Sequence, residues 1–145
     1  MRPATPSTIL ALDVGERRIG VARASMVARL AAPLATVERG SNTMAEIRKL
    51  VETEQAVTIV VGLPRGLDGQ HTQQTAAVEA FGAELAAEVP VSVRWQDEAV
   101  TSKKAEAELQ ARGKPYQKGD VDALSATYIL EDFLRDHQDR LEGAS

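Results

Sequence analysis

The sequence lacks cysteine and has only two histidines, His71 and His137, among 145 residues. The absence of cysteine excludes disulfides, thiolate zinc sites and a cysteine nucleophile, and it fits a cytoplasmic protein. Two histidines are too few for a histidine-rich metal centre. Any metal would therefore have oxygen ligands, which favour Mg²⁺ or Mn²⁺.

Long hydrophobic runs, aromatic residues and excess positive charge are also missing. No apolar run reaches about 18 residues, so we expect no membrane span, and the N-terminus lacks the apolar segment of a signal peptide. Aromatic residues make up 3% of the chain, which gives no evident stacking platform for single strands. The net charge of −4 argues against a generally basic nucleic-acid-binding surface.

Positive charge is nevertheless concentrated in one segment. Residues 101–119 carry two acids and five basic residues, which are Lys103, Lys104, Arg112, Lys114 and Lys118. Residues 120–145 carry seven acids and two arginines. Such runs are commonly solvated surface, and the alternative is a local phosphate-binding patch beside an acidic segment.

The length and a hydrophobic content of 43% fit a single domain over residues 1–145. We expect flexible tails at residues 1–7 and about 138–145. Periodicity predicts strands at residues 8–14, 18–25, 29–37, 57–62 and 91–96, and helices at 43–54, 72–89, 101–112 and 120–138.

This order of elements predicts an α/β fold. Three strands without an intervening helix form an antiparallel meander, and the alternation that follows adds two strands parallel to the first. The result is a mixed five-stranded sheet with helices on both faces. In such sheets ligands bind at the carboxyl ends of the parallel strands.

Acidic residues stand at those ends. Asp13 interrupts an apolar strand, Asp97 and Glu98 end the fifth strand, and Asp122 begins the apolar stripe of the last helix, which Asp120 is expected to cap. If the fourth strand lies between the first and fifth, these carboxylates can surround one or two cations, an arrangement suited to phosphodiester hydrolysis.

Simpler interpretations of two of these aspartates remain open. Asp13 can be a turn aspartate before Gly15. Asp122 can be an acid of the first helical turn, favoured there by the helix dipole.

Four segments in this order resemble the YqgF family, also called RuvX. The segments are "LALDVGERRIGVA", "IVVGLPRGLDG", "QDEAVTS" and "KGDVDALSATYIL". The family comprises bacterial proteins of ribonuclease H-like fold, described as Holliday junction resolvases and as nucleases that process the 5′ end of pre-16S rRNA. The resemblance implies a metal-dependent nuclease with catalytic, metal-binding carboxylates at Asp13, Glu98 and Asp122, and Asp97 as an alternative ligand or a supporting group.

The chain departs from the family pattern after Glu98. Ala99 stands where the family usually has arginine, and Ser102 replaces a threonine. An arginine at that place would pair with the acidic cluster or the scissile phosphate. Arg17, Arg18, Arg65 and Lys103 are the candidate replacements.

The expected partner is nucleic acid, either an rRNA precursor or branched DNA. The candidate contacts are Arg17, Arg18, Arg65, Lys103, Lys104, Lys114 and Lys118. A resolvase cuts two symmetric strands and would act as a homodimer, whereas an RNA-processing nuclease can be a monomer. A binding module that cleaves nothing is the alternative function, and an actin-like ATPase is disfavoured because it needs two such domains.

Overall fold

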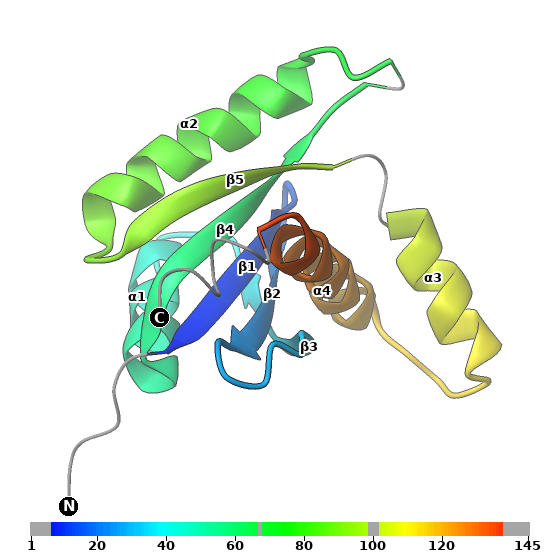
Figure 1. Ribbon diagram of the computed structural model, residues 1–145. Helices are drawn as coiled ribbons and strands as arrows, with labels where there is room; N and C mark the ends of the chain where they lie inside the picture. The colour runs from blue at the N-terminus through cyan, green and yellow to red at the C-terminus, as the bar shows by residue number, and fades with distance from the viewer. Residues whose placement is uncertain (1–6, 67, 99–101, 138–145) are drawn as a thin grey trace, which may run out of the picture.

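The computed structural model describes residues 7–66, 68–98 and 102–137, without the side chains of Ser102 and Lys103. The two expected tails, apart from Ser7, and Ala99 lie outside the described residues. In chain order the elements are β1 (Thr8–Val14), β2 (Arg18–Ser25), β3 (Ala32–Glu38), α1 (Thr43–Glu54), β4 (Ala56–Pro64), α2 (Gln73–Glu88), β5 (Ser92–Glu98), α3 (Ser102–Ala111) and α4 (Lys118–Asp136) (Figure 1).

The five strands form one mixed sheet in the order β3-β2-β1-β4-β5. β1 and β2, and β2 and β3, pair antiparallel, whereas β4 is parallel to both β1 and β5. The predicted topology is therefore confirmed, including the position of the fourth strand between the first and the fifth. Because β1, β4 and β5 run the same way, their carboxyl ends meet at one edge.

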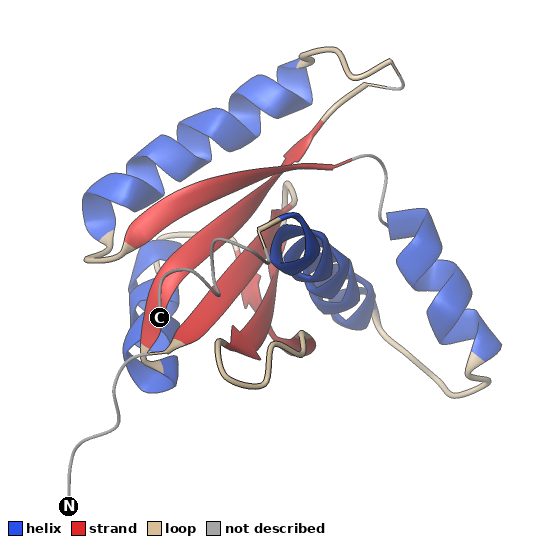
Figure 2. Cartoon of the chain, in the orientation of Figure 1, coloured by secondary structure: helices blue, strands red, loops and turns tan. Residues whose placement is uncertain are grey.

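Helices cover both faces of the sheet (Figure 2). Alternate residues of β1 point to opposite faces, so Leu10 and Leu12 pack in the core with α1 and α2, while Ile9 and Ala11 pack against α4. α3 packs on the side of α4 through a smaller apolar cluster around Leu109. None of the helices in the described ranges combines the length and apolarity needed to cross a membrane.

Two glycines set the path of α4 across the sheet. A Cβ atom at Gly20 of β2 would overlap the carbonyl oxygen of Asp122, and one at Gly62 of β4 would lie 2.5 Å from Ile129 Cδ1. α4 therefore crosses from β2 to β4 and passes over β1, which lies between them. Because Asp13 pairs with Gly20, this crossing brings Asp122, near the start of α4, to the carboxyl end of β1.

The start of α4 differs from the prediction. Gln117 is the N-cap, and Asp120 is three residues into the helix, where its side chain accepts a 2.9 Å hydrogen bond from the Gln117 backbone N–H. The prediction of Asp120 as the cap was wrong, because its carboxylate closes the capping box from inside the helix. Thr36 Oγ1 of β3 also donates a 2.8 Å hydrogen bond to the Gly119 carbonyl, which fixes this end on the sheet.

Candidate active site

Asp13 lies near the end of β1, on the face that α4 covers. It is largely buried, and the residue opposite it in β2 is Gly20, which contributes no side chain. Burial, and then the nearby negative charge of Asp122, raise the pKa of Asp13 from 3.8 to about 6. The structure therefore brings two of the three predicted catalytic carboxylates together.

Arg18 is the positively charged partner of Asp122. The turn between β1 and β2 consists of Glu16 and Arg17 and is closed by a 2.9 Å hydrogen bond from the Gly15 N–H to the Arg18 carbonyl. The Arg18 side chain extends from the start of β2, and its Nε donates a 2.7 Å hydrogen bond to Asp122 Oδ2. Their side chains are only 27% and 23% exposed, so solvent screens this ion pair less than a surface pair.

An open hollow of about 520 Å³ lies beside these residues, lined by Gly15, Glu16, Arg17, Arg18, Lys118 and Asp122. Three of the predicted nucleic-acid contacts, Arg17, Arg18 and Lys118, thus surround the hollow that contains Asp122. Cations next to acidic metal ligands suit a phosphate that is bound on one side by arginine and on the other by metal.

Glu98, the third predicted catalytic carboxylate, lies elsewhere along α4. Its pKa is raised from 4.5 to about 8, first by burial, then by a hydrogen bond to Asp132 and by the negative charge of Asp132. Asp132 follows Asp122 by ten residues of helix, roughly 15 Å along the axis. The structure therefore places Glu98 against Asp132 and not with Asp13 and Asp122.

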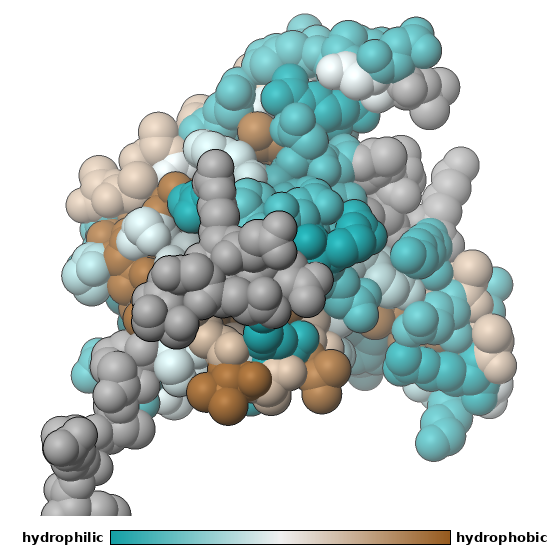
Figure 3. All heavy atoms as spheres, viewed as in Figure 1, coloured by the Kyte–Doolittle hydropathy of each residue, from teal (hydrophilic) through white to brown (hydrophobic). Residues whose placement is uncertain are grey.

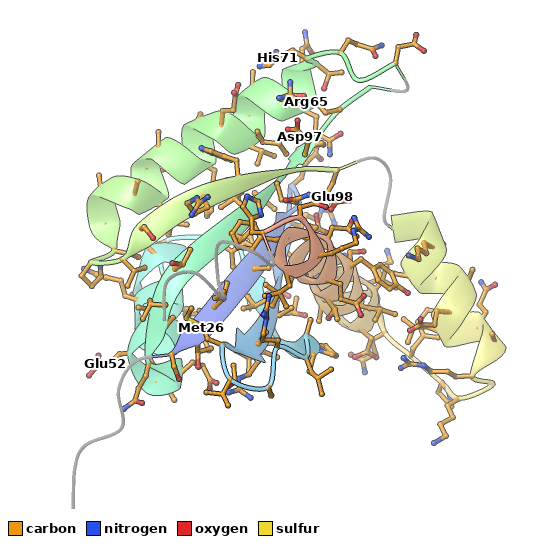
Figure 4. All side chains as sticks on the ribbon, viewed as in Figure 1. Met26, Glu52, Arg65, His71, Asp97 and Glu98 are labelled. Carbon is orange, nitrogen blue, oxygen red and sulfur yellow. The ribbon has the colours of Figure 1, made fainter. Side chains whose placement is uncertain are left out.

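Asp97 and Arg65 form a separate pair on the opposite face of β5. Arg65 donates to Asp97 Oδ1 from Nη2 at 3.1 Å and from Nε at 3.2 Å, and the Asp97 side chain is 67% exposed. Figure 4 shows these two side chains beside the β4–α2 segment, whereas Glu98 lies next to α4. The alternation of strand side chains explains the separation of neighbours 97 and 98.

The basic segment 101–119 is divided by the fold. Lys118 lines the hollow beside Asp122. Lys104 Nζ lies 4.4 Å from the centre of the Tyr128 ring on α4, and Lys114 lines a different hollow of about 240 Å³ between α3 and α4. The side chain of Lys103 lies outside the described residues.

The donor set fits a hard divalent cation. Within the described part of the chain no three histidine or acidic side chains form a metal-binding group, but Asp13 and Asp122 provide two adjacent carboxylates. Mg²⁺ is commonly held by one or two carboxylates together with substrate phosphates and water. Among the described residues, Glu98 Oε1 is buried and has no hydrogen-bond partner, so this carboxylate has an oxygen available for a further ligand.

Sequence reasoning missed Asp132 and the two glycines under α4. A glycine inside a strand indicates a close backbone approach, so Gly20 in "RIGVA" and Gly62 in "IVVG" carried a detectable signal. Asp132 carried none, because only the packing of α4 against β5 makes it the partner of Glu98.

The surface at the edge of the sheet that carries the candidate carboxylates is polar, and exposed apolar side chains lie at the opposite edge of the sheet. Hydrophilic residues cover the β4–α2 loop and α3 in Figure 3. Val27 and Leu30, which are 86% and 77% exposed, lie in the β2–β3 loop, at the end of β2 that pairs with the start of β1. The polar edge is the one suited to a charged substrate.

Comparison with known proteins identifies relatives over most of the chain. The model of the RuvX family, described as Holliday junction resolvase, matches residues 7–136. A Chloroflexus aggregans protein named "Putative pre-16S rRNA nuclease" is 44% identical over 131 residues, covering 88% of this chain and 92% of that protein. A Shewanella oneidensis protein of the same name is 36% identical over 134 residues, covering 90% and 95%.

Solved structures show the same fold at low sequence identity. RuvC from T. thermophilus, in complex with a Holliday junction substrate, superposes with a TM-score of 0.50 at 17% identity, covering 90% of this chain and 95% of that one. The fowlpox virus Holliday junction resolvase gives 0.52 at 11% identity, covering 89% and 99%. The fold is that of the ribonuclease H-like resolvases, and the chain belongs to the RuvX family.

Proposed function

We propose that this protein is a metal-dependent nuclease that hydrolyses phosphodiester bonds in structured nucleic acid. The observation that carries the proposal is the pair Asp13 and Asp122 beside a hollow lined by Arg17, Arg18 and Lys118. The names of the curated relatives favour the 5′ end of pre-16S rRNA as substrate. The family description favours a Holliday junction. Either substrate would be met in the cytoplasm.

Each part of the site has a separate task in this proposal. Asp13 and Asp122 would hold Mg²⁺ or Mn²⁺, which when bound supplies an activated water and stabilises the leaving oxygen. Arg17 and Lys118 bind backbone phosphates and so position the strand without reading its sequence. Glu98 is the third proposed ligand, and it would have to leave Asp132 to complete the ligand set.

The test is cleavage of a pre-16S rRNA 5′-end fragment and of a four-way DNA junction, each with Mg²⁺ and with Mn²⁺. We expect Asp13→Asn, Glu98→Gln and Asp122→Asn each to lower the rate about 100-fold or more, the scale of losing one electrostatic contact to the transition state. Substrate binding should persist. Asp97→Asn is the matched control and should remain active, because Asp97 faces away from Asp13. Full activity of Asp13→Asn would falsify the assignment.

The two substrates also differ in the assembly that they require. Paired, symmetric cuts by a homodimer on the junction would favour the resolvase, whereas cleavage of the rRNA fragment by a monomer would favour the processing nuclease. Tight binding of both substrates without cleavage under either metal would leave the protein as a binding module.

A further inference from the structure

In the structure the side chain of Arg18 already binds Asp122, one of the two carboxylates that would hold the metal. Arg18 Nε lies 2.7 Å from Asp122 Oδ2. This hydrogen bond, and then the negative charge of Asp122, stabilise the cationic form of Arg18 and raise its pKa above the ordinary value. A divalent cation bound by Asp122 would have to share that carboxylate with the guanidinium or displace it.

The sheet register makes this contact a built feature of the fold. Arg18 precedes Gly20 by two residues on the same face of β2, and the Asp122 carbonyl lies directly over Gly20. Asp13 pairs with Gly20 on the neighbouring strand. Arg18 is thus fixed against Asp122, while Asp13 lies on the neighbouring strand beside the same segment of α4.

We propose, on the basis of the nuclease function above, that Arg18 is an internal counter-ion which competes with the divalent cation for Asp122 and is released to a substrate phosphate when the cation binds. Arg18 also lines the hollow beside Asp122, so the released guanidinium already lies where a strand would pass. The planar guanidinium group can bind a phosphate in the same bidentate way in which it binds a carboxylate. Because the exchange links two ligands, metal should strengthen phosphate binding and phosphate should strengthen metal binding.

The first measurement uses the metal alone, without nucleic acid. Thermal melts across a Mn²⁺ series give the concentration for a half-maximal stability increase. We expect Arg18→Ala and the longer Arg18→Gln to lower that concentration roughly two- to fivefold, the upper part of the range for solvent-accessible ion pairs. Both replacements keep the backbone carbonyl of residue 18, which accepts the hydrogen bond that closes the turn. Arg17→Ala is the control, since it removes the same charge from the same turn without touching Asp122, and should cause a smaller change.

The second measurement is a double-mutant cycle on RNA-duplex binding in EDTA, where no cleavage occurs. Asp122→Asn removes the competitor carboxylate, so Arg18 should be free and the duplex should bind more tightly. In an Arg18→Ala background Asp122→Asn should increase the duplex affinity by a factor at least about twofold smaller. There it only removes a negative charge near the phosphates and releases no arginine. Equal gains in both backgrounds would overturn the release step.

The outcomes separate this inference from the nuclease function. A lower half-maximal Mn²⁺ concentration in Arg18→Ala than in Arg17→Ala supports competition, even if no cleavage is found. A Mn²⁺ response in the wild type with an unchanged concentration in Arg18→Ala overturns the counter-ion role alone. No Mn²⁺ response in any variant overturns the metal site and with it both proposals.

Discussion

Asp13 carries an electrostatic cost that comes first from its burial and then from the nearby charge of Asp122. Its pKa of about 6, against 3.8 for an ordinary aspartate, means that the folded protein holds a proton which the unfolded chain releases at intermediate pH. Asp13 therefore favours the folded state fully below about pH 4, and this contribution is lost as pH rises through about 6.

We predict that Asp13→Asn raises the metal-free melting temperature at pH 8, where the carboxylate is ionised, and leaves it nearly unchanged at pH 4. The expected gain is about 3 kcal/mol, or roughly 6–12 °C for a chain of this length. Melts of both proteins at the two pH values measure it, with Asp97→Asn as the exposed control. A lower melting temperature at pH 8 would return Asp13 to the interpretation of a simple turn aspartate.

A side chain that contradicts its surroundings is the clearest residue-level signal in the sequence. A carboxylate inside an apolar strand indicated a site at Asp13, and Asp122 on an apolar stripe indicated a second acid facing the sheet. The sequence grouped Asp97 with Glu98 as candidate ligands, although strand alternation places such neighbours on opposite faces. It does not predict which faces, or that Glu98 rests against Asp132, because those depend on contacts between distant segments.

At the level of elements, α4 determines whether the site exists. Its N-terminal part lies on β2 because Gly20 leaves no side chain between the strand and the Asp122 carbonyl. This contact fixes the distance of Asp122 from Asp13, and also the geometry of the Arg18 ion pair.

We predict that Gly20→Ala destabilises the protein by about 2–3 kcal/mol, the cost of overpacking a close contact, and abolishes the metal-induced stabilisation. The control is Gly40→Ala, since a Cβ there would meet nothing within 4 Å and the change should stay within about 0.5 kcal/mol. Thermal melts with and without Mn²⁺ test both variants. Equal melting temperatures for the two variants would show that α4 does not need the close contact.

The elements themselves were predictable from pattern, and their ends were less so. The helix predicted at 43–54 matches α1, because periodicity and flanking loops agree there. The last helix begins two residues before its predicted start, because Gln117 caps it with Asp120 acting from inside. Capping side chains on both sides of a boundary make such ends ambiguous from sequence.

On the scale of the whole molecule, a chain with net charge −4 must bind nucleic acid through a local surface. The fold brings Arg17 and Lys118, about a hundred residues apart in sequence, to one hollow, which is the surface that we propose. Lys114, though near Lys118 in sequence, lines another hollow. Sequence proximity alone had grouped the two lysines together.

We predict that the double variant Arg17→Ala, Lys118→Ala weakens duplex DNA binding and flattens its salt dependence by about 0.9 per lost phosphate contact, or roughly 2 in total. Lys114→Ala should leave the slope unchanged. Anisotropy titrations over a salt series give both slopes. A flatter slope for Lys114→Ala and a normal one for the double variant would place the strand over α3 instead.

The ion pair between Arg18 and Asp122 joins residues 104 positions apart, and α4 follows all five strands along the chain. A growing polypeptide on the ribosome therefore carries Asp13 long before Asp122 has been synthesised. Long-range contacts of this kind form late, after the intervening chain has collapsed. If Asp13 and Asp122 act together as we propose, a half-made or clipped chain without a docked α4 would lack one of the two carboxylates and would not cleave nucleic acid before the fold is complete.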